Sequence, residues 1–534
     1  MRKKTKSAAK RAKAALKKTA QGLGVLAGGV SVFLLAMRMS FPLPQRTALV
    51  EELRPAPDIS ATGLREMVAA QSALHPGLSG VVTLQNGADA FAARIHLART
   101  ATVSIDAQYY IWKDDLTGLR LLSELQDAAK RGVKVRLLVD DNGTEGLDQE
   151  LAALDALPSA EVRIFNPFTL RKYRRLNYAF DFFRLNRRMH NKSFTVDGVI
   201  TVVGGRNIGD IYFETGGALN YIDLDVFAAG PVATDVSADF SRYWASPAVY
   251  PAGQLITLLP GSETQLEQRD AALRNTVEGR RYAEYVHSSA FSDALMAMTL
   301  PMEWVPALLV SDTPDKVLGL EADSDLMIRR LFAEIGTPQT SLDLISAYLI
   351  PGTTATAQLN DFAKQGVRVR TLTNALESTD VAIVHGAYAS YRKTLLAGGV
   401  EVYELKSDAG PRQSVREIEL FALSKAALHA KGFTIDRRRT FIGSLNFDPR
   451  SRRLNTEMGL LIDSTAIAGV VSDWLDENLA TIAYRVSLDA QQDLVWTAQD
   501  RDGTEVRFDV EPNTTLPLRI LIKALGLLPI QWLL

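Results

Sequence analysis

The sequence predicts an α/β fold made of two similar halves, each a mixed, parallel-rich sheet flanked by helices. The halves are expected to be related by a pseudo-twofold axis, with the candidate site at their interface. Three observations predict this. The chain has 534 residues, more than the ~100–200 typical of one domain. A strand–helix–strand pattern occurs twice along it, and each copy ends in the same short polar motif.

The first copy begins with a strand and continues through alternating elements. The run VSIDAQYYIW (103–112) is rich in β-branched and aromatic residues, as expected of a buried strand. The segment 119–132 has helical periodicity and closes on a glycine suited to a helix C-terminus. Two further strands are predicted at 133–141 and 160–167, on either side of a helical stretch near 147–157.

The second copy repeats this order. A strand is predicted at 340–350 and a helix ending on glycine at 354–366, followed by a strand at 367–375. A helical stretch near 387–398 then leads into the strand at 399–406. Repeated strand–helix–strand units favour parallel neighbours joined by right-handed crossovers.

These repeats predict two similar domains, at residues 60–300 and 310–500, after an N-terminal tail, anchor and linker at 1–59. Residues 1–20 carry nine Lys and Arg and no acidic residue. An apolar run follows them, although it is shorter than the ~20 residues that span a bilayer.

We expect a single retained membrane anchor at about residues 20–40, with Arg38 snorkelling to the headgroups. A cleaved signal peptide is the alternative, but the basic region is long and no A-x-A-like site follows the apolar run. The positive-inside rule then places the tail in the cytoplasm and the catalytic domains on the periplasmic, outer side of the inner membrane.

The C-terminal segment, 501–534, is also apolar. Pro517 and Pro529 argue against a full span, so we expect a membrane-interfacial segment with Trp532 near the headgroups. A helix packed on the core is the alternative.

The composition limits the partners. The chain has no cysteine, which excludes disulfides and thiolate metal sites. Its net charge is −1, yet the chain after residue 20 has ten more acidic than basic residues. That balance opposes binding of a long polyanion, so no nucleic acid is expected.

The repeated motif is H-x-K-x₄-D-x₆-G-[GS]-x-N. Its first copy has His190, Lys192, Asp197 and Asn207, and its second copy has His429, Lys431, Asp436 and Asn446. Residues two apart on a strand share a face, and glycines let backbone approach a ligand closely. One imidazole, one ammonium and one amide from each half would form a symmetric cradle for an anion.

A lone histidine beside a strand is more often a structural hydrogen-bonding residue than a catalyst. Here, however, the complete motif occurs twice inside a duplicated scaffold, which chance does not produce. Neither a G-x-x-x-x-G-K-[ST] loop nor a strand-linked G-x-G-x-x-G occurs, so ordinary nucleotide sites find no support.

This pattern resembles the HKD signature of the phospholipase D superfamily. Several stretches are similar to bacterial cardiolipin synthases of the two-motif type, and the similarity covers nearly the whole chain after residue 60. They are QYYIWKDDLTG (108–118), RMHNKSFTVDG (188–198), LHAKGFTID (428–436), GSLNFDPRS (443–451), LNTEMGLLID (454–463) and the closing LLPIQWLL.

The resemblance implies six catalytic motif residues: His190, Lys192, Asp197, His429, Lys431 and Asp436. One neutral imidazole attacks phosphorus and the other, protonated, serves the leaving group. By resemblance His190 is the nucleophile and His429 the acid/base, although the sequence leaves the reverse open.

The phosphate oxygens are expected to contact Lys192, Lys431, Asn207 and Asn446. In the family each histidine is oriented by a downstream acid. Glu457 follows His429, and Asp223 follows His190. No metal and no cofactor is required by this scheme.

The segment 170–192, just before and into the first motif, is dense in Arg, Lys and aromatic residues. A solvated basic helix and a nucleic-acid contact are the alternatives, but apolar segments at both ends favour lipid. We therefore expect a phosphatidyltransferase that uses phosphatidylglycerol, with phosphatidylethanolamine as another candidate donor. A phospholipase D making phosphatidic acid, a nuclease and a non-enzymatic membrane scaffold remain alternatives, and protein partners are not indicated.

Overall fold

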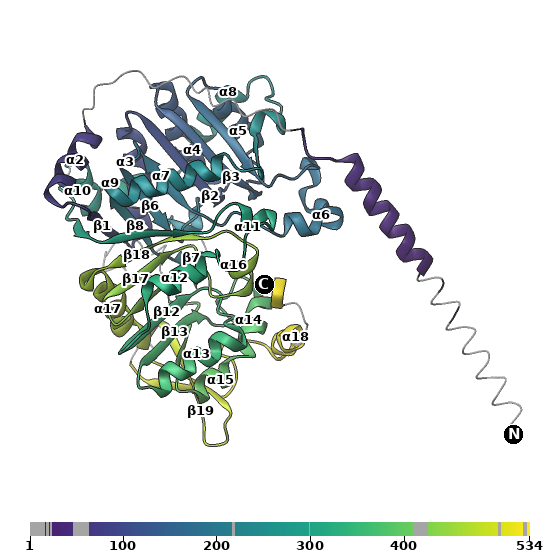
Figure 1. Ribbon diagram of the computed structural model, residues 1–534, viewed down its shortest axis with the longest axis vertical. Coiled ribbons are helices and arrows are strands. Elements are labelled where there is room, and N and C mark those ends of the chain that lie inside the picture. Colours follow the sequence, from purple (N-terminus) through teal and green to yellow (C-terminus); the bar gives the residue numbers. More distant parts are fainter. Residues whose placement is uncertain are drawn as a thin grey trace, which may run out of the picture. The chain divides into compact units, whose positions relative to one another are not determined.

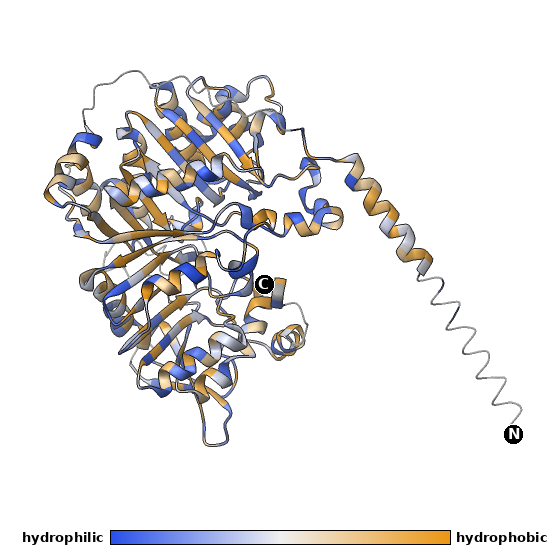
Figure 2. Ribbon diagram, in the orientation of Figure 1, coloured by the Kyte–Doolittle hydropathy of each residue, from blue (hydrophilic) through white to orange (hydrophobic). Residues whose placement is uncertain are grey.

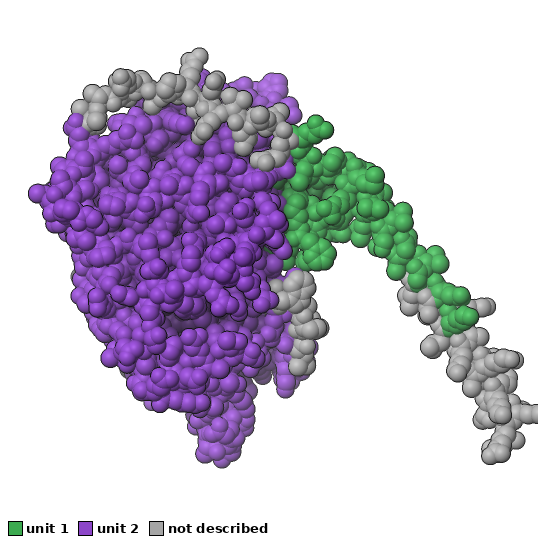
Figure 3. Space-filling view, viewed as in Figure 1, with its two compact units in different colours: residues 1–48, 167–186 green, residues 49–166, 187–534 purple. Residues whose placement is uncertain are grey.

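The computed structural model describes residues 17, 21, 24–45, 63–215, 219–297, 299–409, 425–499, 503–526 and 531–533. The chain divides into two compact units. The first combines residues 1–48 with 167–186, and the second holds residues 49–166 and 187–534 (Figure 3). Both copies of the polar motif belong to the second unit.

The first half of the second unit is built on a nine-stranded sheet in the order β10-β1-β8-β6-β5-β2-β3-β4-β9 (Figure 1). Strands β2, β3 and β4 are parallel neighbours, and the other neighbouring pairs are antiparallel. The strands are β1 (Ser79–Leu84), β2 (Ser104–Ile111), β3 (Lys134–Gly143), β4 (Ala160–Phe165), β5 (Ser193–Val196), β6 (Ile200–Gly204), β8 (Asp225–Ala229), β9 (Val249–Pro251) and β10 (Glu303–Val305).

The second half repeats this arrangement in a ten-stranded sheet, ordered β11-β18-β17-β16-β12-β13-β14-β19-β20-β21. Strands β12, β13 and β14 are again the parallel neighbours. The strands are β11 (Ala307–Ser311), β12 (Ser341–Ser346), β13 (Arg368–Asn374), β14 (Glu401–Leu405), β16 (Lys431–Ile435), β17 (Arg439–Gly443), β18 (Met458–Asp463), β19 (Ala483–Leu488), β20 (Leu494–Gln499) and β21 (Glu505–Phe508).

The predicted fold class of two similar α/β halves is confirmed by this shared strand order. The sheets are less parallel than predicted, because parallel pairing is confined to three strands in each. After the third parallel strand the chain returns through hairpins. The β5–β6 turn has Asp197 at φ 53° and Gly198 at φ 69°, as a tight two-residue turn requires.

Helices cover the sheets in matching positions. Helices α4 and α13 make the first parallel crossover of each half, and α7 and α17 follow the equivalent strands β8 and β18. Helices α8 to α10 were not predicted, and they have no counterpart among the residues of the second half that the structure describes. In the first half the helices are α2 (Leu64–Leu74), α3 (Gly87–Thr100), α4 (Leu116–Lys130), α5 (Asp148–Asp155), α7 (Pro231–Trp244), α8 (Ser262–Arg274), α9 (Val277–His287) and α10 (Ala290–Met296). In the second they are α11 (Asp315–Leu318), α12 (Met327–Ile335), α13 (Gly352–Lys364), α14 (Ala382–Ala389), α15 (Arg392–Ala397), α16 (Pro449–Arg453), α17 (Thr465–Ile482) and α18 (Leu516–Gly526). Short 3₁₀ turns are η2 (Asp210–Tyr212), η3 (Ala252–Gln254) and η5 (Gln531–Leu533).

A shared apolar core joins the two halves. Valines of β6 and β8 pack in one buried cluster with Met458 and Leu460 of β18. A separate two-stranded sheet also crosses the boundary, since β7 (Leu219–Ile222) of the first half pairs in parallel with β15 (Lys425–Leu428) of the second. The two halves are therefore continuous in both core and backbone hydrogen bonding.

The first unit contains a helix at residues 24–40 (purple in Figure 1), together with η1 (Arg171–Leu176) and α6 (Asn177–Leu185). Phe41 stacks with Phe180 at 6.3 Å between ring centroids. The helix at 24–40 is largely apolar (Figure 2). Within the described ranges, no helix has both the length and the apolarity to cross a membrane, so the predicted anchor stays a prediction.

The apolar C-terminal segment contains α18, which packs on α14. The two helices approach closely, because a Cβ added to Gly526 would lie 2.6 Å from the carbonyl oxygen of Gly386. The other face of α18 leaves Leu516 and Ile520 exposed. The helix thus has one packed face, as the alternative reading expected, and one exposed apolar face. The side chain of Trp532, which is predicted to lie near the headgroups, is not among those that the structure describes.

Candidate active site

Each motif histidine stands just before a strand and is held there by the other half of the molecule. The backbone N–H of His190, before β5, donates to the carbonyl oxygen of Thr456 at 2.9 Å. The N–H of His429, before β16, donates to the carbonyl oxygen of Ile222 at 2.8 Å. In both cases the accepting residue directly precedes a buried acid.

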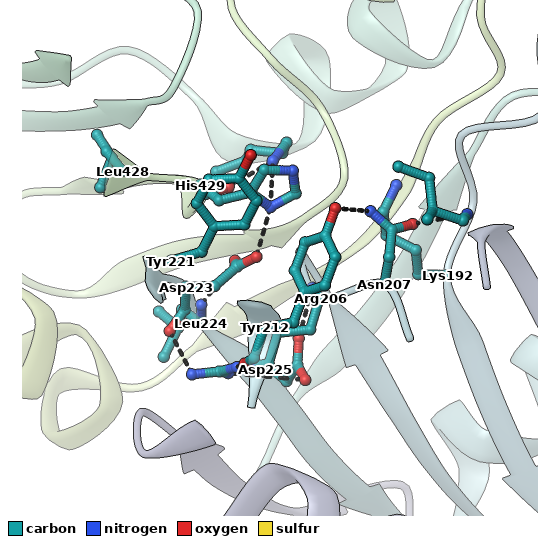
Figure 4. A network of polar contacts seen from close by, with 12 residues as sticks. Lys192, Arg206, Asn207, Tyr212, Tyr221, Asp223, Leu224, Asp225, Leu428 and His429 are labelled. Atoms are coloured by element: carbon teal, nitrogen blue, oxygen red, sulfur yellow. Dashed lines mark hydrogen bonds and ion pairs between the residues drawn. The ribbon is translucent and has the colours of Figure 1, made fainter. Parts of the chain in front are cut away.

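Those acids orient the imidazole rings, and the pairing is crossed between the halves. His190 Nδ1 lies 2.8 Å from Glu457 Oε2, and His429 Nδ1 lies 2.6 Å from Asp223 Oδ2 (Figure 4). This corrects the expectation that each acid serves the histidine upstream of it in its own half. A carboxylate at Nδ1 favours the tautomer with its proton there, which leaves Nε2 as the free nitrogen.

The two motif lysines are buried beside the histidines. Lys192 Nζ donates to the carbonyl oxygen of His190 at 2.5 Å, and Lys431 Nζ lies 3.0 Å from His429 Nδ1. Both lysine side chains are buried. Burial lowers the pKa of each, that of Lys192 strongly. Charged groups of one half shift the pKa values of groups in the other half, as expected for one shared centre.

The histidines differ in their electrostatic surroundings. Burial, reinforced by the charges of Lys192 and Lys431, holds the pKa of His190 well below its usual value. Burial and Lys431 also lower the pKa of His429, but the carboxylate of Asp223 acts in the opposite direction. His190 is therefore the ring held more strongly in its neutral form, and His429 is the ring that takes up a proton more readily.

The two acids are themselves held in place. Burial raises the pKa of Glu457, although hydrogen bonds from Ser444 at 2.5 Å and Ser451 at 2.7 Å stabilise its ionised form. Burial acts on Asp223 too, but the charge of His429 and the hydrogen bond from its ring hold the pKa of that carboxyl below its usual range. The carboxylate at His429 is thus the more firmly ionised of the two.

The predicted asparagines have unequal surroundings. Asn207 accepts from the N–H of Ile111 at 3.1 Å and donates to the hydroxyl of Tyr212 at 3.0 Å (Figure 4). One of its amide protons is therefore committed to the scaffold. Asn446 is buried, and its Oδ1 accepts no hydrogen bond within the described residues.

The motif aspartates lie at the far ends of their strands. Strand β5 carries the chain ~13 Å from Lys192 before Asp197 is reached. Asp197 accepts from the backbone N–H groups of Thr102, Val103 and Ser104. Asp436 accepts in the same way from Gln339, Thr340 and Ser341. These contacts join two strands of each sheet, so we correct the expectation that all three motif residues work at the reacting centre.

Aromatic rings that the sequence analysis did not assign surround the histidines. Tyr221 stacks on His429 at 4.9 Å, and Tyr212 meets the same ring edge-on at 5.1 Å. Tyr110 meets His190 edge-on, also at 5.1 Å. The hydroxyl of Tyr221 donates to Asp380. Tyr110 lies in the run VSIDAQYYIW, of which only the strand character was used in the prediction.

Comparisons with known proteins agree with this architecture. A family model described as "Cardiolipin synthase, PLD-like domain" matches residues 94–244 and again 331–479. Cardiolipin synthase C of Escherichia coli is 45% identical over 461 residues, which cover 86% of this chain and 97% of that protein. A cardiolipin synthase of Halalkalibacterium halodurans is 26% identical over 73% of this chain and 64% of its own length.

A solved structure shares the fold. The phosphatidylserine synthase of Haemophilus influenzae superimposes with a TM-score of 0.52 at 14% identity, over 88% of this chain and 100% of that one. At that level of identity the likeness concerns the fold alone.

Proposed function

Because this chain belongs to the family of cardiolipin synthases with phospholipase D-like domains, we propose that it is a phosphatidyltransferase. It transfers a phosphatidyl group to a hydroxyl of phosphatidylglycerol through a phosphohistidine. Glycerol or another headgroup alcohol is released. The observation that carries the proposal is the crossed pairing of His190 with Glu457 and of His429 with Asp223 in one buried centre beside Lys192 and Lys431.

In the first step Nε2 of His190 attacks phosphorus, forming a P–N bond while the bond to the headgroup oxygen breaks. His429 gives its proton to that departing oxygen. A bound phosphodiester carries negative charge, which opposes the effect of the lysines and raises the pKa of His429, so that the ring holds a proton in the complex.

In the second step His429 removes the proton from the incoming hydroxyl. The oxygen of that hydroxyl attacks phosphorus and the P–N bond breaks. This regenerates neutral His190 and leaves His429 protonated. Lys192 and Lys431 stabilise the charge on the nonbridging oxygens, and we assign Asn446 the same part. Asn207, with one amide proton still available, is proposed to contribute less.

The acceptor decides between synthase and hydrolase. The reacting histidines are only 7% and 8% exposed, and exclusion of bulk water favours a lipid hydroxyl over hydrolysis. We therefore propose synthesis of cardiolipin rather than release of phosphatidic acid. The donor is phosphatidylglycerol or phosphatidylethanolamine.

We propose that the protein works at a membrane, through the anchor at about residues 20–40 and the aromatic segment before the first motif. In that segment Phe183 and Tyr173 are exposed, beside the basic Lys172 and Arg175. Aromatic rings next to cations suit an anionic lipid surface. The excess of basic residues in the tail supports a periplasmic placement of the catalytic domains, which protease accessibility in intact cells tests.

The function is tested with the purified full chain in detergent micelles. Given phosphatidylglycerol, with or without phosphatidylethanolamine, it is expected to form cardiolipin detectable by lipid mass spectrometry. Phosphatidic acid as the sole product would assign a phospholipase D instead, and nicked DNA a nuclease. No product from any of these substrates would overturn the enzymatic assignment.

A further inference from the structure

An apolar cleft opens in the second half between α12 and α13, with the sheet as its floor. Its volume is about 100 Å³, below the ~300–1,000 Å³ of sites that enclose a whole drug-sized ligand, so it has room for part of a ligand such as a length of hydrocarbon chain. None of the residues that line it is charged. They are Phe332, Gly336, Thr337, Pro338, Leu342, Leu344, Ala355, Gln358, Leu359, Phe362, Phe433, Ile435 and Phe447.

The same sheet positions are sealed in the first half. There Ile105 pairs with Val196 and Ala107 with Phe194, and all four side chains are 0% exposed. In the second half the equivalent pairs are Leu342 with Ile435 and Leu344 with Phe433, and these are 5–8% exposed. At these paired positions the sheet of the second half is therefore less tightly covered than that of the first.

The helices explain the difference. In the first half α3 has 14 residues, and its Phe91 is covered by the ring of Tyr282 from α9 at 5.8 Å. The equivalent α12 has only nine residues and stops at Gly336, which has a φ of 82°. The α8–α10 segment that covers α3 has no counterpart among the described helices of the second half.

The cleft is in line with the catalytic centre. Side chains two apart on a strand share a face, so Lys431, Phe433 and Ile435 of β16 form one row at steps of ~7 Å. Phe447, next to Asn446, lines the cleft and donates its N–H to Ser346, the partner of Lys431 across the sheet. A molecule with a phosphate at Lys431 could thus extend an apolar part toward Phe433.

We propose that this cleft binds one acyl chain of the phospholipid whose phosphate is held between His190 and His429. The inference rests on the proposed function and adds where the lipid chain lies. An uncharged cleft lined by Phe433, two residues along β16 from Lys431, matches a molecule with a charged head and a hydrocarbon tail. The sealed first half then leaves the second half to recognise that chain.

The test is a bulky substitution on α13. Ala355 lines the cleft, whereas Ala357 on the same helix is exposed and does not. Ala355→Trp is expected to lower kcat/KM at least tenfold for phosphatidylglycerol with long acyl chains, because each excluded methylene costs about fourfold. With short-chain phosphatidylglycerol, and in Ala357→Trp with either lipid, the change is expected to stay within twofold. Equal losses for both chain lengths in Ala355→Trp, as a cleft reserved for a protein helix would give, overturn the proposal.

Photolabelling keeps the proposal testable if Ala355→Trp does not fold. The wild-type full chain is irradiated with phosphatidylglycerol carrying a diazirine in its acyl chain, and the labelled peptides are mapped by mass spectrometry. Labels are expected within 327–364 or 433–447, the two segments that hold the lining residues. Labels confined to other segments overturn the acyl-chain site, whereas absence of cardiolipin formation with correct labelling would overturn the proposed function alone.

Discussion

Glu457 Oε2 lies 2.8 Å from Nδ1 of His190, although 267 residues separate the two in the chain. The imidazole of the first half, which we propose as the nucleophile, thus contacts a carboxylate of the second. Asp223 and His429 repeat the relationship in the opposite direction. Each proposed step therefore depends on both halves. The roles of the two acids can be tested separately by substituting one acid at a time.

Glu457→Gln is expected to slow formation of the phosphohistidine about 10–100-fold, because the amide no longer fixes the tautomer of His190. Rapid quench with a donor labelled in its phosphate measures the rate at which label enters the protein. Glu477→Gln, an exposed change on α17, serves as the control. An unaltered labelling rate in Glu457→Gln would contradict the orienting role.

Asp223→Asn is expected to change the pH profile. The Asp223 carboxylate raises the pKa of His429, and the proposed mechanism needs His429 protonated. Loss of that charge lowers the pKa, so the alkaline limb of kcat/KM moves to lower pH. The profile is measured with saturating acceptor and compared with Asp235→Asn, an exposed change on α7. An alkaline limb that stays in place would show that another group controls it.

His190→Ala is expected to remove labelling of the protein and cardiolipin formation together, since the nucleophile is lost. His429→Ala is expected to lower turnover by ~10²–10⁴ while leaving His190 able to accept label. The readout is denaturing electrophoresis of protein incubated with labelled donor, with His287→Ala, an exposed histidine, as the control. Label retained in His190→Ala but lost in His429→Ala would reverse the assignment of the two rings.

Asp197→Asn is expected to reduce stability rather than chemistry. Its carboxylate is buried and accepts from three successive backbone N–H groups, so the substitution is expected to lower the free energy of unfolding by about 2–3 kcal/mol. Denaturant titration measures that loss, and kcat per folded molecule is expected to stay within twofold. A fall in kcat at an unchanged free energy of unfolding would show that Asp197 takes part in catalysis.

Phe183→Ser is expected to weaken binding to vesicles that contain phosphatidylglycerol. Phe183 is 78% exposed, and a ring that enters the lipid interface loses that contact as serine. Sedimentation with vesicles gives the bound fraction, and Leu259→Ser, at an exposed leucine outside the first unit, is the matched control. Equal binding of both variants would assign membrane contact to other residues.

The duplicated motif made the fold and the reacting groups predictable. The repeated spacing singled out His190, Lys192, His429 and Lys431, and the resemblance to the HKD signature implied their roles. Spacing did not identify the partner of each acid. Distance along the chain favoured the acid in the same half, whereas the crossed β7–β15 and Met189–Thr456 contacts bring in the acid of the other.

Two other residues have contacts that differ from those expected from the sequence, for similar reasons. The aspartate of the motif is part of the recognisable signature, yet Asp197 serves the start of β2 from the end of β5. That arrangement depends on which strands are neighbours. Asn207 was expected to face the phosphate, and its bond to Tyr212 follows from a 3₁₀ turn that the local sequence did not indicate.

The parallel pairing of β7 with β15 has a consequence for genetics. Because each half supplies the acid and the backbone acceptor for the other's histidine, a complete centre is assembled within a single polypeptide. Cells that carry two inactive alleles, one with His190→Ala and one with His429→Ala, should not regain cardiolipin formation, since every folded chain would still lack one ring.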